Sequence, residues 1–132
     1  MKTVILDTNF LVDCLAWRVD FFTELERVLP FTYELKVVDK TLDEIDRIIA
    51  TAKDDSKIGA KLAKQVIAKR RVGVILTDKK GYTDTIILKL ADTDTTVVAT
   101  QDQGFKRRLK ANGVPVVIIR QKKYLQFLNA RE

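Results

Sequence analysis

The chain has 132 residues and a mass of 15.1 kDa, which is the size of one typical domain. With 46% hydrophobic and 32% charged residues, and no apolar run near the ~18 residues that span a membrane, the composition indicates a soluble globular protein. The absence of histidine excludes Ser-His-Asp triads, Cys-His pairs and HExxH zinc sites. The single cysteine, Cys14, cannot form an internal disulfide, and the N-terminus carries no export signal, so we expect a cytoplasmic location.

The charge balance favours a polyanionic partner. Lysine and arginine number 24 against 18 aspartate and glutamate residues, which gives a net charge of +6 and a pI near 9.5. Thirteen of the acids are Asp and five are Glu, although Glu is the better helix former. We therefore expect many of the aspartates at loops, helix caps or sites, and any catalysis must depend on carboxylates.

Apolar spacing predicts alternating strands and helices. An unbroken apolar stretch predicts a strand at 3–6, and helical spacing predicts a helical hairpin over 10–29 that turns at 18–20 and stops at Pro30. Further strands are predicted at 33–38, 72–76, 96–99 and 114–119. Helices are predicted at about 42–49, 56–71, 83–90 and 103–111, with a C-terminal helix over 121–129.

These elements predict an α/β fold. Each strand is nearly all apolar, whereas antiparallel strands with one wet face would alternate, so we expect a parallel sheet of about five strands covered by helices on both faces. No linker, repeat or low-complexity tract interrupts the chain. The prediction is a three-layer α/β/α sandwich in a single domain over 1–132.

Four acids follow the predicted strands. Asp7 and Asp102 come directly after the first and fourth strands. Asp84 begins the helix after the third strand, and Glu44 lies in the first turn of the helix after the second. Sites in open parallel sheets form beyond the carboxyl ends of the strands. Carboxylates that converge there repel one another unless a cation neutralises them, and oxygen-only ligands suit Mg²⁺ or Mn²⁺.

Each acid also has a structural interpretation. Asp7, Asp84 and Asp102 stand where Asp commonly caps a helix, and taken singly the cap is the better interpretation. The run Thr41-Leu42-Asp43-Glu44 matches a capping box, so capping and metal binding are about even for Glu44. The joint placement of these acids at one sheet edge of a basic protein without histidine favours a site.

Several segments resemble the motifs of PIN-domain ribonucleases. VILDTNFLVD resembles the opening motif, YTDTIILKLA the third motif and TVVATQD the closing Thr/Ser-x-Asp motif, while Glu44 falls where that family places its second acid. The run VVATQDQGFKRRLKANGVPVVIIRQKKYLQF is similar to archaeal PIN proteins related to the ribosomal-RNA-processing endonucleases of the small-subunit processome. The resemblance covers essentially the whole chain.

The resemblance implies a PIN-like nuclease domain and a Mg²⁺- or Mn²⁺-dependent endoribonuclease. The implied catalytic and metal-binding residues are Asp7, Glu44, Asp84 and Asp102, with Thr8, Asn9 and Thr100 as neighbours that orient them.

One departure from the family pattern affects the number of metals. Many relatives have two adjacent acids in the third motif, whereas Thr83 precedes Asp84 here, and the lost carboxylate weakens a second metal site. Asp39 and Asp78 also follow strands and are weaker site candidates, while turn roles are expected for Asp92 and Asp94.

A negative site repels RNA, so cations must surround it. Lys79 and Lys80, just before Asp84, are the best placed; the other candidate RNA contacts are Lys106, Arg107, Arg108, Lys110, Arg120, Lys122 and Lys123. Tyr124 is a candidate for stacking on a base. A solvated face is the better interpretation of Lys69, Arg70 and Arg71. The aromatic residues Phe10, Trp17, Phe21 and Phe22 are assigned to the core or to a self-association surface, which leaves a homodimer open.

Three functions remain. The leading one is an endoribonuclease that acts on RNA in ribosomal RNA processing. The second is a VapC-like toxin ribonuclease held in check by an antitoxin partner, which has the same chemistry. The third is a non-catalytic RNA-binding ribosome-assembly factor, which the missing adjacent acid at Thr83 favours.

Overall fold

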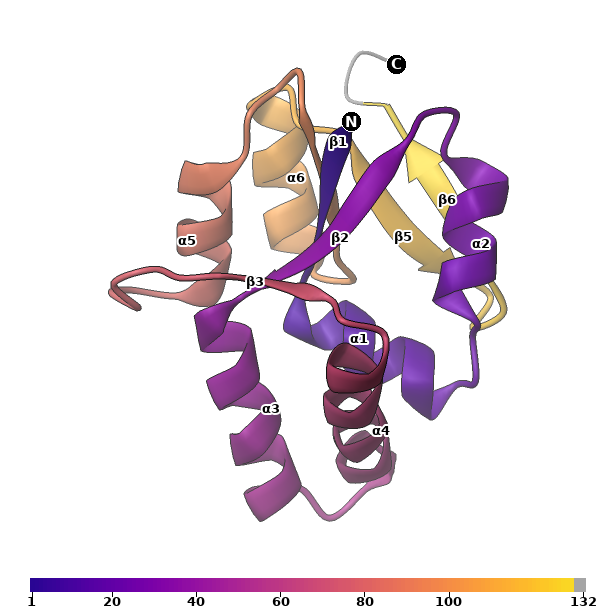
Figure 1. The fold of residues 1–132 in the computed structure, drawn as a ribbon, viewed down its shortest axis with the longest axis vertical. Coiled ribbons are helices and arrows are strands. Elements are labelled where there is room, and N and C mark those ends of the chain that lie inside the picture. Colours follow the sequence, from indigo (N-terminus) through magenta and orange to yellow (C-terminus); the bar gives the residue numbers. More distant parts are fainter. Residues whose placement is uncertain (130–132) are drawn as a thin grey trace.

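The computed structural model describes residues 1–129, which form one six-stranded sheet with helices on both faces (Figure 1). The strand order is β3-β2-β1-β4-β5-β6, with parallel pairing throughout except that β6 runs antiparallel to β5. The predicted three-layer α/β sandwich is confirmed, with six strands instead of about five. In chain order the elements are β1 (Lys2–Leu6), α1 (Thr8–Ala16), α2 (Phe21–Val28), β2 (Tyr33–Val38), α3 (Asp39–Thr51), α4 (Asp55–Lys69), β3 (Gly73–Ile75), α5 (Thr83–Leu90), β4 (Thr96–Ala99), α6 (Gln103–Ala111), β5 (Val116–Arg120) and β6 (Tyr124–Leu128).

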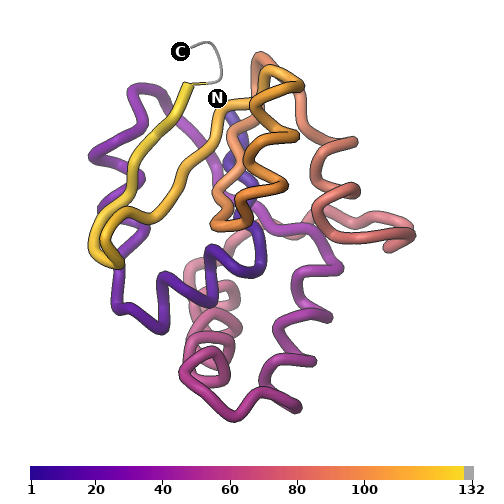
Figure 2. The backbone as a smooth tube through the Cα atoms, turned by 180° about the vertical axis from the view of Figure 1, so that it is seen from behind, coloured from indigo at the N-terminus to yellow at the C-terminus, as the bar shows by residue number. Residues whose placement is uncertain are grey.

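The central strands divide their side chains between two apolar cores. In β1, Val4 and Leu6 face the core that α1 to α4 cover, whereas Ile5 faces the core that α5 and α6 cover. Strand residues alternate in this way because successive side chains point to opposite faces of a sheet. Helices α1 to α4 contribute to one core and α5 and α6 to the other. In Figure 1, α5 and α6 lie to the left of the strands, α2 lies to the right, and α1, α3 and α4 lie below them; Figure 2 shows the same arrangement from behind.

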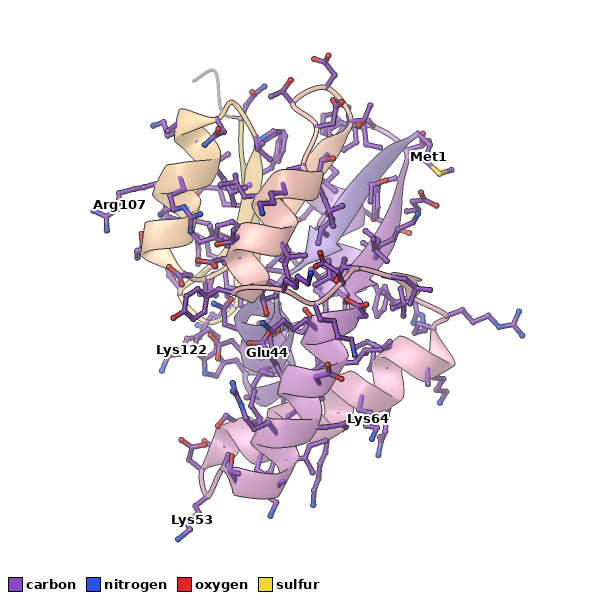
Figure 3. The ribbon with its side chains drawn as sticks, turned by 90° about the vertical axis from the view of Figure 1, so that its left-hand side faces the viewer. Met1, Glu44, Lys53, Lys64, Arg107 and Lys122 are labelled. Atoms are coloured by element: carbon purple, nitrogen blue, oxygen red, sulfur yellow. The ribbon has the colours of Figure 1, made fainter. Side chains whose placement is uncertain are left out.

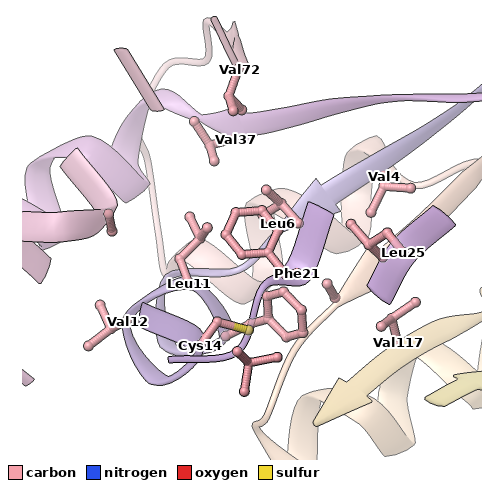
Figure 4. Close-up of a cluster of buried hydrophobic side chains, with 14 of the residues drawn as sticks. Val4, Leu6, Leu11, Val12, Cys14, Phe21, Leu25, Val37, Val72 and Val117 are labelled. Atoms are coloured by element: carbon pink, nitrogen blue, oxygen red, sulfur yellow. The ribbon is translucent and has the colours of Figure 1, made fainter. Parts of the chain in front are cut away.

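The larger core accounts for the aromatic residues of the N-terminal hairpin. Phe10 and Phe21 are fully buried and meet edge to face with ring centroids 6.3 Å apart, and Phe22 and Trp17 pack against the same cluster. Figure 4 shows Phe21 and Cys14 side by side within this cluster. Cys14 is fully buried, so the predicted buried cysteine is confirmed, and this burial raises the pKa of its thiol.

The C-terminal segment was predicted as a helix, and that prediction is wrong. Residues 124–128 form β6, which pairs with β5 from Arg120 opposite Tyr124 to Val116 opposite Leu128. The turn between the two strands places Gln121 and Lys122 at positive φ (52° and 55°), and the Lys123 amide donates to the Arg120 carbonyl. Two left-handed central residues define a type I′ turn, which matches the twist of a hairpin.

The strand order fixes where a site can form. The chain passes from β1 to β2 and β3 on one side and then returns to β4 on the other side of β1, so the strand order reverses between β1 and β4. The crevice beyond their carboxyl ends is the usual binding position in such sheets. Within residues 1–129, no helix combines the length and apolarity that crossing a membrane requires.

Candidate active site

A cavity of about 460 Å³ lies where β1 and β4 end, and all four predicted acids line it. They come from four separate parts of the chain, and Figure 3 shows Glu44 near the middle of the molecule, whereas Arg107 and Lys53 extend outward from it. The polar residues of the lining are Asp7, Thr8, Asn9, Asp13, Glu44, Ser56, Tyr82, Thr83, Asp84 and Asp102.

Asp7 is the most deeply placed of the four acids, with 6% of its surface exposed. The strand ladder continues through it, because its amide donates to the Ala99 carbonyl. Its carboxylate accepts hydrogen bonds from the Thr8 amide (2.9 Å) and the Thr100 hydroxyl (2.8 Å). Burial nevertheless raises its pKa to about 6, and the negative charges of Glu44 and Asp102 act in the same direction.

Asp102 both caps a helix and lines the cavity. Its carboxylate accepts from the Phe105 amide at 2.9 Å as the N-cap of α6, so the predicted cap is confirmed. Its own amide donates to the Thr100 hydroxyl (3.1 Å), the same hydroxyl that donates to Asp7. Thr100 thereby fixes the backbone of one acid and the side chain of the other, which supports its predicted orienting position.

Glu44 is not part of a capping box. Helix α3 begins at Asp39, so Thr41 lies inside the first turn, fully buried, instead of at the cap. The Glu44 carboxylate accepts from two hydroxyls, those of Thr8 and Thr83, each at 2.7 Å. Glu44 therefore joins α3 to α1 and α5 across the cavity, and the even choice between capping and a site role is resolved against the cap.

Asp84 is likewise not an N-cap, the interpretation that the sequence favoured for it when taken singly. Helix α5 starts at Thr83 after Tyr82, which makes no side-chain cap, and Asp84 accepts from the Thr85 amide in the first turn (2.7 Å). The second carboxylate oxygen accepts from the Arg108 guanidinium at 3.0 Å. Arg108, predicted to contact RNA, thus neutralises a cavity acid in this structure.

The Asn9 side chain ties α1 to the end of β4. Its carbonyl oxygen accepts from the Gln101 amide (3.1 Å), and the Gln101 side chain in turn accepts from the Ile119 amide of β5 (2.7 Å). Sequence reasoning missed Gln101, since only its place between Thr100 and Asp102 marks it. Thr8 and Thr100 hydrogen-bond to the acids themselves, whereas Asn9 lines the cavity and contacts the segment between Thr100 and Asp102.

A family comparison bears on this arrangement. Residues 4–122 match the model of the PIN-like domain family. The chain belongs to the PIN-like domain family. Over 129 residues it is 30% identical to the protein named Ribonuclease VapC4 of the archaeon Methanocaldococcus jannaschii, an alignment that covers 96% of both chains. The PIN-like assignment and the likeness to an archaeal relative, both expected from the motifs, are confirmed.

Solved structures confirm the PIN-like fold. The structure of the PIN domain endonuclease Utp24 superposes with a TM-score of 0.76 at 23% identity, over 95% of this chain and 90% of that one. A domain of a protein of unknown function from Methanocaldococcus jannaschii superposes with a TM-score of 0.60 at 15% identity, over 91% and 92%. At these identities the likeness concerns the fold.

The donor set of this PIN-like site fits a hard divalent cation. The cavity offers carboxylate and hydroxyl oxygens and no thiolate or imidazole, which suits Mg²⁺ or Mn²⁺. Burial is the main cause of the raised pKa of Asp7, and the negative charges of Glu44 and Asp102 add to it, so a bound cation would stabilise the charged form. Each acid is held by hydrogen bonds to protein groups, and within residues 1–129 no three acidic or cysteine side chains already surround one point, so the fit is one of donor chemistry and not of a preformed cage.

None of the predicted RNA-contacting cations lines the acidic cavity within the described chain. Lys79 lies in the loop that precedes α5, and its ammonium pairs with the Asp43 carboxylate of α3 at 2.8 Å. The Lys122 ammonium lies 5.2 Å from the centroid of the Trp17 ring, and the Arg120 guanidinium donates to Gln126. The cations Lys106, Arg107 and Lys110 border a separate cavity of about 280 Å³ with Val114, Val116, Leu128 and Asn129.

Three polar residues of the lining, Asp13, Ser56 and Tyr82, were missed by sequence reasoning. Asp13 lies one helical turn after Asn9 on α1, a spacing that places both on one face of a helix and could have revealed it. Burial raises the pKa of Asp13, and the Lys122 charge lowers it. Tyr82 lines the cavity from the start of α5, whereas Tyr124, the predicted stacking residue, lies on β6 outside the lining.

The weaker candidate acids have structural roles. Asp39 accepts from the amide and hydroxyl of Thr77, hydrogen bonds that lower its pKa, and neither it nor Asp78 lines the cavity. Asp92 accepts from the Asp94 amide (2.8 Å) ahead of β4, which is the turn role expected for both.

Proposed function

We propose that this chain is a metal-dependent endoribonuclease that hydrolyses RNA phosphodiester bonds at the acidic cavity. The observation that carries the proposal is the carboxylate of Asp7, which is buried beside the charges of Glu44 and Asp102 although no lysine or arginine lines the cavity in the described chain. Structural caps need no such crowding of acids. The relative named Ribonuclease VapC4 supports the same reaction class.

The acids would bind the cation, and neighbouring threonines would orient two of them. Asp7, Asp84 and Asp102 would hold Mg²⁺ or Mn²⁺, with Glu44 as a fourth acidic group. When bound, such a cation lowers the pKa of a water molecule and offsets the charge that builds on the phosphate. The hydroxyls of Thr8, Thr83 and Thr100 hold the carboxylates in fixed orientations, since each donates to one of them.

Two biological roles remain for the proposed activity. Alignment over nearly the whole length with Ribonuclease VapC4 favours a VapC-like toxin that an antitoxin holds in check. Ribosomal RNA processing in the cytoplasm, the role expected from the C-terminal motif, stays a prediction. Growth arrest on expression, relieved by a protein encoded next to it, would support the toxin; accumulation of unprocessed ribosomal RNA when the gene is deleted would support processing.

The test is cleavage of structured and single-stranded RNA by the purified protein with Mn²⁺, Mg²⁺ or chelator. Asp7→Asn, Asp102→Asn and Glu44→Gln should each reduce metal-dependent cleavage at least about 100-fold, because an amide cannot supply the charge that holds a cation. Asp46→Asn is the matched control, an exposed carboxylate on α3 that pairs with Lys64 outside the cavity. Wild-type cleavage by Asp7→Asn would refute the site, and RNA binding without cleavage by the wild type would favour the assembly factor.

A further inference from the structure

The loop between β3 and α5, residues 76–82, carries two strongly exposed large side chains. Leu76 is 84% exposed at its start and Tyr82 is 81% exposed at its end. Figures 1 and 2 show this β3–α5 loop extending outward past α5, away from the sheet. Aromatic rings of this size are normally largely buried, because each buries 150–250 Å² of surface on average. The exposure of Tyr82 therefore needs a reason beyond folding.

The loop is fixed to α3 at three points. The amide and hydroxyl of Thr77 donate to Asp39 at 2.8 and 2.6 Å. The Lys79 ammonium pairs with Asp43 at 2.8 Å, and the Lys40 ammonium donates to the Gly81 carbonyl. Anchors along its length give the loop a defined course, so its side chains are presented in a preorganised position, which lowers the entropic cost of binding.

Tyr82 stands at the wall of the acidic cavity. Its carbonyl accepts from the Ile86 amide at 3.0 Å as α5 begins, and the next residue, Thr83, is buried with its hydroxyl on Glu44. The backbone of Tyr82 is thereby held next to the acids. Tyr82 is one of the residues that line the cavity, and its side chain is exposed and packs on no other aromatic ring within residues 1–129. The flat face of the Tyr82 ring is thus free to contact a ligand at the cavity.

We propose that Tyr82 is a substrate-positioning residue that stacks on a nucleobase of the bound RNA and aligns the strand over the acids; this rests on the proposed function. The acids repel phosphates, so close to them a strand is held better through its bases. Stacking on an aromatic ring suits this task because every base has a π-face. The Lys80 ammonium, which forms no ion pair within the described chain, lies two residues away for an adjacent phosphate.

The test compares two oligomers with equal numbers of phosphates, a hexanucleotide RNA and an abasic hexamer, by fluorescence anisotropy in chelator, where no cleavage occurs. The wild type should bind the RNA more tightly than the abasic hexamer. Tyr82→Ala should weaken RNA binding about 5- to 100-fold and leave abasic binding unchanged, as expected when a base loses its stacking partner. Tyr82→Phe and Tyr82→Trp should retain the preference, because both keep a ring.

Two controls separate stacking from general effects. Leu76→Ala removes an equally exposed apolar side chain from the other end of the loop, and Tyr124→Ala removes a tyrosine outside the cavity. Both should bind like the wild type. Equal affinities of the wild type for the two hexamers, or equal losses for both hexamers in Tyr82→Ala, would overturn the inference. A Tyr82-dependent preference for RNA without any metal-dependent cleavage would leave the inference standing and refute the proposed nuclease.

Discussion

Asp7 combines a position in the centre of the fold with a charge that its position disfavours. It ends the central strand β1, and its two hydrogen bonds from Thr8 and Thr100 offset only part of the cost of burial. Removing a carboxylate from water disfavours its charged form, and nearby negative charges add to that cost. The charged Asp7 carboxylate therefore destabilises the folded chain at neutral pH.

The pH dependence of stability follows from this cost. Because the folded-state pKa of Asp7, about 6, lies above the ordinary aspartate value of 3.8, the folded chain binds the proton more tightly than the unfolded chain. Stability in chelator should therefore fall as pH rises from about 4 to about 6, by up to about 3 kcal/mol. Asp7→Asn should lack this step and exceed the wild type at pH 7, as measured by urea denaturation across this range.

The exposed Asp46→Asn variant provides the comparison, because its carboxylate is paired at the surface with Lys64. It should keep the wild-type loss of stability with rising pH. If Asp7→Asn were less stable than the wild type at pH 7 in chelator, the hydrogen bonds of the carboxylate would outweigh its burial cost, and the electrostatic argument for the site would be wrong.

At single residues, sequence reasoning located the acids better than their local roles. Asp7 and Asp102 follow strands whose ends share one sheet edge, so their convergence with Glu44 and Asp84 could be predicted. The prediction of a capping box at Thr41 was wrong because α3 starts two residues earlier, at Asp39. The Asp39 carboxylate accepts a hydrogen bond from Thr77, which belongs to a distant segment of the chain. A local motif cannot reveal a partner 38 residues away.

Among the elements, α1 and α4 make an unusually close approach at Gly59. A Cβ atom at this position would lie 2.3 Å from the Val12 carbonyl oxygen and 3.2 Å from the Ala16 Cβ. Glycine costs roughly 1 kcal/mol in a helix relative to alanine, so its presence is explained by the space that the helix pair lacks. Since α1 also carries Thr8, Asn9 and Asp13, this contact supports the cavity wall.

Gly59→Ala should therefore destabilise the chain in spite of its better helix propensity. Overpacking against backbone costs about 1 to 3 kcal/mol, which exceeds the gain of up to about 1 kcal/mol from alanine. Gly104→Ala, on α6, is the matched control, because its Cβ would meet only the Asp102 carboxylate at an ordinary 3.4 Å. Urea denaturation should show a lower midpoint for Gly59→Ala and an equal or higher one for Gly104→Ala; a more stable Gly59→Ala would contradict the close packing.

The sheet could be predicted up to its last strand. The parallel strands are short apolar runs, a pattern that predicts buried strands. The apolar residues of β6, in contrast, also fit helical spacing; they are Tyr124, Leu125, Phe127 and Leu128. Its turn uses Gln121 and Lys122 at positive φ where Asn-Gly is usual, so no turn signal marks the hairpin. Pairing with β5 decides between the two patterns, and pairing depends on tertiary structure.

On the scale of the whole molecule, the net charge of +6 is not spread evenly around the site. The cavity is lined by acids, Arg108 is engaged with Asp84, and Lys106, Arg107 and Lys110 border a different cavity. The β3–α5 loop carries Lys79 and Lys80 shortly before Tyr82 and Thr83 of the cavity lining, and the Lys80 ammonium forms no ion pair within the described chain. We therefore expect the phosphates of an RNA strand that reaches the acids to be attracted by Lys79 and Lys80 of this loop.

Two double variants test this arrangement at constant net charge. Lys79→Ala with Lys80→Ala removes two cations from the β3–α5 loop, and Lys61→Ala with Lys69→Ala removes two exposed cations from α4, so each pair lowers the net charge from +6 to +4. If phosphates contact the loop, the first pair should weaken binding about equally across RNA sequences and reduce the slope of log affinity against log salt by about 0.7 for each lost contact. The second pair should change the slope little. Equal changes from both pairs in a salt titration would mean that RNA is attracted by the total charge alone, with no defined path to the acids.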